Sequence, residues 1–182
     1  MTSAIAKIIV IPMRINPKNL LLTMPLFIYN PIKKYLNPFI SDFFLIVMRD
    51  QFWLEQRLQQ IWELLYHDTP KQNTVRIRFK GRWKNKFGHI KRLPNKDTEI
   101  VINGLFKSEF IPEYVVDLTI AHEVAHYAHG FHSPLPQLFK HPHKGGVVNR
   151  ELRKRGFGHL LRKEKYFMKQ EWPVLYEKLR EL

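Results

Sequence analysis

The stretch from Ala121 to Gly130 constrains this chain most, because it contains the pattern His-Glu-x-x-His. Residues four apart share one face of a helix, so His122 and His126 can direct two imidazoles to one metal ion. Glu123 then lies beside the ion without binding it, where its carboxylate can take a proton from metal-bound water. The pattern predicts a zinc site (Zn2+) with Glu123 as general base.

The residues around the motif predict that it lies on a helix. Pro112 suits a first helical turn, and Gly130 suits the left-handed position that ends a helix. Between them apolar residues recur at steps of three and four, namely Val116, Ile120, Val124 and Tyr127. This stripe favours a helix that packs on a core with the face away from the ligands, and the alternative is a plain amphipathic helix with surface histidines.

Catalytic zinc usually takes three protein ligands, and the sequence offers several candidates for the third. His129 is near the face of His126 but one turn further along, which places it beside the site or on the surface. His132 follows Gly130, where the chain can turn back towards the ion. The candidates beyond a longer loop are His141, His143 and Glu151. The spacing alone leaves this choice open.

The composition limits both the kind of metal site and the partners. The 182 residues include no cysteine, so a bound metal must rest on His, Asp or Glu, and a reducing cytoplasm is the expected location. A formal net charge of +14 predicts attraction to nucleic acid, ribosomes, acidic proteins or an anionic membrane surface. The 45% hydrophobic content is enough for the core of one domain, which we expect to be monomeric.

Residues 1 to 47 differ from the rest of the chain because prolines interrupt every apolar run. None of these runs reaches the roughly 20 apolar residues of a membrane-spanning helix, and no secretory signal fits. We expect a peripheral arm that docks on the domain, contacts a membrane surface, or is spurious sequence upstream of a start at Met48. Residues 48 to 182 are expected to form the functional domain.

The segments before and after the motif predict an α+β fold. Apolar residues at helical spacing indicate an N-terminal helix from Arg49 to His67. From Val75 to Leu105 the period changes to two, which predicts a small three-stranded antiparallel sheet. Further helices are expected near residues 147 to 155 and from Leu160 to Leu182.

Basic and aromatic residues alternate in the predicted sheet, a composition compatible with phosphate contact and base stacking. The candidates for contact with nucleic acid are Arg82, Lys84, Lys86 and Arg92. The alternative interpretation is a solvated strand face with structural aromatics.

Residues 75 to 157 resemble the SprT-like metallopeptidase domain. The resemblance rests on the strand Ile100-Val101-Ile102-Asn103, the His-Glu-x-x-His helix, and two later segments, His143 to Val147 and Leu152 to Phe157. It implies a minimal zincin-like fold, peptidase activity and His143 as the third zinc ligand. The chain departs from the family pattern because glycine does not directly follow His143, Val147 replaces an aromatic residue, and the C-terminal cysteine ribbon of many members is missing.

A rival resemblance leads to a different third ligand. Residues 113 to 132, with Val115-Val116-Asp117 before the motif and His132-Ser133 after it, are similar to the YgjP-like zinc hydrolases. That similarity implies His132 as the third ligand. Of the two, we favour His143.

The motif and the resemblance together predict a zinc-dependent metallopeptidase that acts on a protein or peptide substrate. His132, His141 or Arg150 are candidates to stabilise the oxyanion that forms during hydrolysis. The alternative from another functional class is a basic protein that binds nucleic acid or ribosomes and carries a structural zinc.

Overall fold

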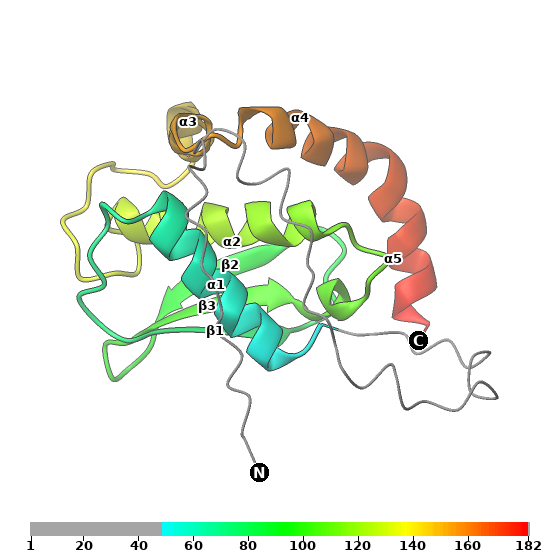
Figure 1. Ribbon diagram of the computed structural model, residues 1–182, viewed down its shortest axis with the longest axis horizontal. Coiled ribbons are helices and arrows are strands. Elements are labelled where there is room, and N and C mark those ends of the chain that lie inside the picture. The colour runs from blue at the N-terminus through cyan, green and yellow to red at the C-terminus, as the bar shows by residue number, and fades with distance from the viewer. Residues whose placement is uncertain (1–48, 182) are drawn as a thin grey trace, which may run out of the picture. The chain divides into compact units, whose positions relative to one another are not determined.

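The computed structural model describes residues 49 to 181, so the predicted arm of residues 1 to 47 lies outside the described residues. In chain order the elements are α1 (Gln51–Leu65), β1 (Val75–Lys80), β2 (Gly88–Arg92), β3 (Thr98–Asn103), α2 (Glu113–Ala128), α3 (Val147–Lys154), α4 (Gly158–Tyr166) and α5 (Trp172–Arg180). Short 3₁₀ turns precede α2 and α3, and a π-helical turn joins α4 to α5 (Figure 1). The predicted α+β class is confirmed.

Helix α1 confirms the predicted N-terminal helix, two residues shorter at each end. It begins after Asp50, whose side chain accepts a hydrogen bond of 2.7 Å from the backbone N–H of Trp53. This capping satisfies a helical N–H that has no partner within the helix. The predicted apolar stripe is buried, with Leu54, Leu58 and Ile61 in the core.

The prediction of a purely antiparallel sheet is wrong. Strand β3 lies in the middle, where it pairs antiparallel with β2 and parallel with β1. A hairpin joins β2 to β3, whereas residues 81 to 87 carry the chain past the end of β3 to the opposite edge. The Asn103 side chain holds this loop by donating to the carbonyls of Trp83 and Lys86. A period of two says which face of a strand is buried, but not which strands are neighbours.

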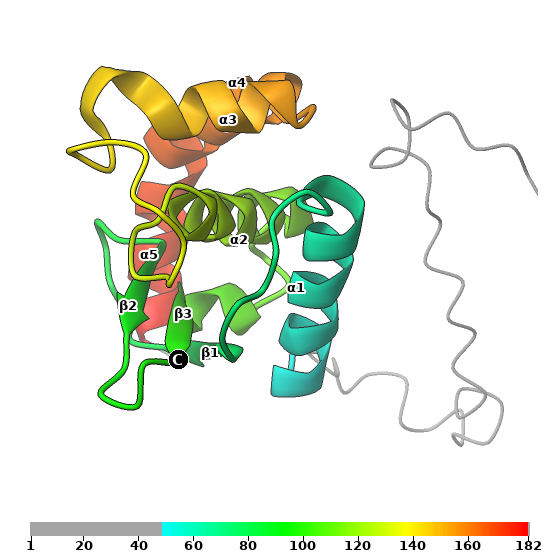
Figure 2. The same cartoon turned by 90° about the vertical axis from the view of Figure 1, so that its left-hand side faces the viewer.

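Helix α2 is the centre of the core. It lies between the sheet on one side and α3 and α4 on the other, with α1 beside it (Figures 1 and 2). As predicted, the helix begins after Pro112 and ends before Gly130, whose φ is 81°. Its burial differs from the expected single stripe, because nearly every residue from Val115 to Tyr127 is buried. The packing of other elements around α2 on several sides is the reason.

Buried polar contacts hold α2 in one orientation. Asp117 accepts two hydrogen bonds of 2.5 Å from the Arg57 guanidinium of α1. The Tyr66 hydroxyl donates to the Ala121 carbonyl at 2.7 Å, and the Tyr127 hydroxyl donates to the Asn73 side chain. Because these contacts fix the rotation of the helix, they also fix the direction in which its histidines project.

The C-terminal helices cover the end of the core near β2. Phe167 and Trp172 are buried and pack against the ring of Phe87. Pro173 lies in the first turn of α5, which follows directly on the π-helical turn Phe167–Glu171, and the chain stays helical through both. Within residues 49 to 181, no helix is both long enough and apolar enough to cross a lipid bilayer.

Candidate metal centre

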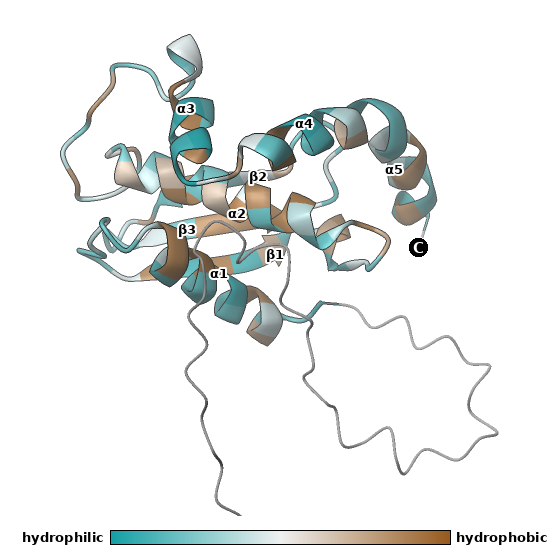
Figure 3. Ribbon diagram, turned by 45° about the horizontal axis from the view of Figure 1, so that its top comes forward, coloured by the Kyte–Doolittle hydropathy of each residue, from teal (hydrophilic) through white to brown (hydrophobic). Residues whose placement is uncertain are grey.

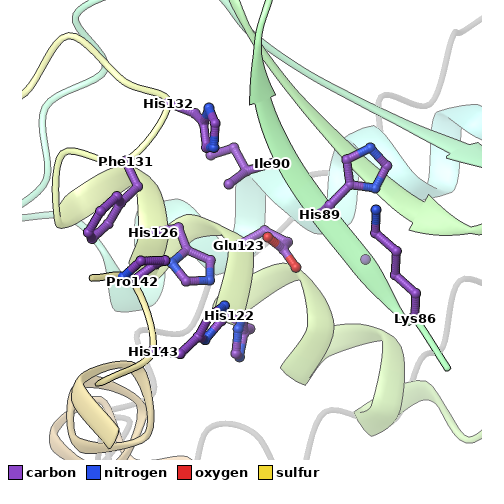
Figure 4. Close-up of a pocket in the computed structure, with 11 residues that line it drawn as sticks. Lys86, His89, Ile90, His122, Glu123, His126, Phe131, His132, Pro142 and His143 are labelled. Atoms are coloured by element: carbon purple, nitrogen blue, oxygen red, sulfur yellow. The ribbon is translucent and has the colours of Figure 1, made fainter. Parts of the chain in front are cut away.

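Helix α2 presents the two motif histidines side by side. The ring centroids of His122 and His126 are 4.8 Å apart, as expected for residues one turn apart on the same face. His126 is buried and His122 is half-buried. The two imidazoles therefore line one wall of a cavity and offer nitrogen atoms to it (Figure 4).

The loop after α2 brings a third histidine to this wall. A Cβ atom on Gly130 would meet the Pro136 carbonyl oxygen at 2.4 Å, so glycine is required where the loop folds back. Ser133 ties the loop to α2 by donating to the Tyr127 carbonyl at 2.8 Å. His143 stands at the end of the loop, with its ring centroid 4.6 Å from that of His126 and 5.4 Å from that of His122.

The three histidines fit a zinc ion. One ligand nitrogen from each of His122, His126 and His143 lies within 4.8 Å of the others. Zinc–nitrogen distances of about 2.0–2.1 Å in a tetrahedron place two ligand nitrogens roughly 3.4 Å apart, so the rings need to close by roughly 1.4 Å at most. The exposed side chain of His143 can make this adjustment by rotation.

Burial keeps the helix histidines in the state that binds metal. It lowers the pKa of His122 to about 4 and that of His126 to about 3, and the neighbouring histidines act in the same direction. Both imidazoles are therefore neutral at neutral pH, with lone pairs available for coordination.

Glu123 lies in the same cavity but does not belong to the histidine cluster. Its carboxylate is buried and points between the histidines and the side chains of His89 and Lys86 (Figure 4). Burial raises the pKa of Glu123 to about 8, while the Lys86 ammonium and the backbone N–H of Ile90 oppose that rise. The carboxylate is thus held against β2, where it can accept or donate a proton.

Strand β2 forms the opposite wall of the cavity, and its outer edge is not paired within the sheet. The Asn103 N–H donates to the Phe87 carbonyl, so by alternation Gly88, Ile90 and Arg92 turn their backbone groups away from β3. The N–H of Ile90 is the one that acts on Glu123. The edge of β2 thus offers backbone donors and acceptors beside the histidine cluster.

Gly88 allows β2 to approach α2 closely. A Cβ atom at this position would lie 2.7 Å from the Thr119 methyl group, 3.0 Å from the Val101 carbonyl oxygen and 3.2 Å from Glu123 Oε1. Because the first two atoms belong to packed elements, a larger residue would push the strand away from the carboxylate.

The cavity has a volume of about 280 Å³. It is lined by Lys86, Gly88, His89, Ile90, His122, Glu123, His126, Phe131, His132, Pro142 and His143. The sequence patterns did not assign His89, Ile90, Phe131 or Pro142 to the site. The sequence signal that could have identified them is the strand alternation next to Gly88, which places one face of β2 against the motif helix.

The other proposed third ligands do not join the cluster. His132 lines the cavity on the side of Ile90, away from the three converging rings (Figure 4). His129 is buried against Phe139 and lies 4.0 Å from Glu151. Glu151 pairs with Arg155. His141 is exposed and does not line the cavity.

The basic residues expected to contact nucleic acid differ in their contacts within the domain. Arg82 donates to the Leu179 carbonyl, and Lys84 pairs with Glu177 of α5 at 3.0 Å. Lys86 lines the cavity, and Arg92 is exposed at the end of β2. Arg150, considered above as an oxyanion donor, is exposed on α3 and does not line the cavity.

Within residues 49 to 181, His122, His126 and His143 form the single group of His, Cys, Asp or Glu residues that can hold a metal ion. Three neutral nitrogen donors with a carboxylate nearby can bind a divalent metal and move a proton next to it. Comparisons of the chain with family models, with curated proteins and with solved structures find no match.

Proposed function

We propose that the protein is a zinc-dependent metallopeptidase. The observation that carries the proposal is the convergence of His122, His126 and His143 in a cavity that also holds the buried carboxylate of Glu123. Three imidazoles that leave one coordination position open are a donor set of catalytic zinc. Nitrogen donors without thiolates also suit copper, iron and nickel, and zinc is favoured by its preference for tetrahedral sites.

Glu123 is the proposed proton carrier. When bound, zinc lowers the pKa of water and polarises the carbonyl of the scissile bond. Glu123 accepts the proton of the attacking water and passes it to the leaving amine. Its position against β2 supports this role, because the carboxylate faces the space between the histidine cluster and the strand edge.

The edge of β2 supports a peptide as the substrate. An extended peptide can pair with outward backbone groups such as those of Gly88 and Arg92, which adds a strand to the sheet and places a peptide bond near Glu123. Ile90 and Phe131 give the cavity apolar surface for substrate side chains. Of the three candidates for the oxyanion donor, His132 is the one that lines the cavity, and we assign it that role.

The position of the third histidine supports a SprT-like relationship. That resemblance implies His143 as a ligand, whereas the YgjP-like similarity implies His132. The approach of His143 to His126, with ring centroids 4.6 Å apart, supports the first of the two. A second candidate function, nucleic-acid binding, is favoured by a separate observation, the Lys and Arg residues of α3 and α4 that form no ion pair.

The substitution Glu123→Gln tests the proposal. It keeps the size of the side chain but removes the proton acceptor, so we expect peptide hydrolysis to fall by about 10²- to 10⁴-fold while zinc stays bound. Hydrolysis is measured with fluorescently labelled casein and a quenched peptide library, and bound zinc by inductively coupled plasma mass spectrometry.

Glu63→Gln is the matched control, because Glu63 lies on the exposed face of α1 away from the cavity. Its hydrolysis rate should equal that of the parent. The proposal fails if zinc-loaded parent protein cleaves no peptide in the library, or if the zinc-bound Glu123→Gln variant cleaves at the parent rate.

A further inference from the structure

The positive charge of the domain is concentrated around α3 and α4. Residues 140 to 169 contain ten Lys and Arg residues but two Glu residues. Both helices present hydrophilic outer surfaces (Figure 3). The basic region therefore extends over two neighbouring helices and not over one helix face alone.

Most of these cations lack an acidic partner. Arg155 pairs with Glu151 and Asp68. Within residues 49 to 181, nine cations of this region form no ion pair, namely Lys140, Lys144, Arg150, Arg153, Lys154, Arg162, Lys163, Lys165 and Lys169. The sheet differs, because Arg76, Arg78 and Lys91 are paired with Asp97 or Glu99. The unpaired charges of α3 and α4 therefore remain available to an external anion.

Part of this charge lines a groove between the two helices. The groove has a volume of about 770 Å³, and its cationic residues are Arg153 of α3, Arg162 and Lys165 of α4, and Lys169 of the following turn. All four are exposed, and Asn149 adds an amide to the same groove. Cations from both walls can thus face one bound chain of phosphates.

The groove also contains one carboxyl group, that of Glu164. Burial raises the pKa of Glu164 to about 7, so a substantial fraction is uncharged at neutral pH. Four cations against one partly protonated carboxyl leave the groove strongly positive.

We propose that this groove binds the phosphate backbone of single-stranded nucleic acid. A concave groove suits a narrow flexible chain better than a flat lipid surface. At 1.5 Å per residue, α3 and α4 are roughly 12–14 Å long, a length that about four nucleotides span when their bases are stacked at about 3.4 Å each, as in one strand of a duplex. Site sizes of about 4 nucleotides or more are typical of sequence-independent single-strand binding.

The experiment measures binding of a fluorescein-labelled 20-nucleotide single-stranded DNA by anisotropy, at salt concentrations from 50 to 300 mM. The groove variant combines Arg153→Glu, Arg162→Glu and Lys165→Glu. We expect it to bind at least tenfold more weakly than the parent at 100 mM salt. The slope of log affinity against log salt should fall by about 2, because each of three lost phosphate contacts contributes about 0.7 for a single strand.

The matched control combines Lys80→Glu, Lys96→Glu and Lys178→Glu, which changes the net charge equally at exposed cations without ion pairs elsewhere in the described domain. It should bind within threefold of the parent, and circular dichroism melting should show that both variants fold. Equal losses in the two variants, or parent-like binding by the groove variant, would overturn the proposal.

Two further arms test the identity of the ligand. Tighter binding to a 20-base-pair duplex than to the single strand would overturn the assignment. It would also be overturned if binding to phosphatidylglycerol vesicles depends on the groove cations while binding to the oligonucleotide does not. The proposal is independent of peptidase activity, since the Glu123→Gln variant should bind the oligonucleotide as the parent does.

Discussion

The candidate metal centre and the groove between α3 and α4 hold their polar groups in different ways. In the metal centre, Glu123 and His126 are each 5% exposed, and α2, β2 and the loop after α2 all contribute to the same cavity. In the groove, Arg153, Arg162 and Lys165 extend into solvent from two short helices. Packing fixes the positions of the polar atoms in the metal centre, whereas the groove mainly concentrates positive charge.

This difference teaches what each region can do. Proton transfer and metal coordination need atoms held to a fraction of an ångström, which buried groups on several packed elements provide. Exposed Lys and Arg side chains keep their rotamer freedom and attract anions without fixed geometry. Single substitutions should therefore have large effects in the metal centre and small ones in the groove.

The largest expected effect concerns zinc affinity. His126→Ala and His143→Ala each remove a proposed ligand and should weaken zinc binding by more than about 100-fold, which exceeds the 10- to 100-fold typical of a lost supporting contact. His132→Ala should weaken binding by less than about tenfold. Competition with a fluorescent chelator measures all three, and equal losses for His132→Ala and His143→Ala would show that the third ligand is assigned wrongly.

The next effect concerns the ion pair that anchors α2. Asp117→Asn leaves the Arg57 guanidinium without its buried carboxylate, so we expect the free energy of unfolding to fall by about 3 kcal/mol. Glu113→Gln removes a more exposed partner of the same arginine, 3.1 Å away, and should cost less than about 1 kcal/mol. Urea unfolding measures both, and similar losses would argue against burial as the cause.

A smaller effect compares one glycine from each region. Gly88→Ala forces a methyl group against Thr119 and Val101, and should lower the free energy of unfolding by about 1–3 kcal/mol. Gly158→Ala in the groove meets the Arg153 side chain at an ordinary 3.7 Å, so helix propensity should make it neutral or stabilising by up to about 1 kcal/mol. Thermal unfolding of both variants measures this difference in stability. A Gly158→Ala variant as destabilised as Gly88→Ala would contradict it.

The last comparison concerns the pH dependence of stability in the groove. Burial raises the folded-state pKa of Glu164 from 4.5 to about 7, so ionisation is easier in the unfolded chain. The parent should therefore lose stability relative to Glu164→Gln as the pH rises from about 4.5 to about 7, with a constant difference above that range. Urea unfolding at several pH values measures this difference in the free energy of unfolding. The explanation would be contradicted if Glu63→Gln gains as much stability over the parent across the same pH range as Glu164→Gln does.

The local elements could be predicted because their signals lie within short stretches. The apolar spacing of Leu54, Leu58 and Ile61 identified α1, and Pro112 with Gly130 marked the ends of α2. The direction of β1 could not be predicted, because the path of residues 81 to 87 depends on hydrogen bonds to Asn103, a residue from another strand. The zinc-peptidase function stays a prediction.

The sequence by itself determined the spacing of His122, Glu123 and His126, since helix geometry places residues four apart on one face. The tertiary structure decided which further histidine approaches them, because the fold of the loop after Gly130 depends on contacts with Pro136 and Tyr127. It also decided which cations are paired and which remain available on α3 and α4. Contacts between distant segments form through packing of the whole domain, so no local pattern contains them.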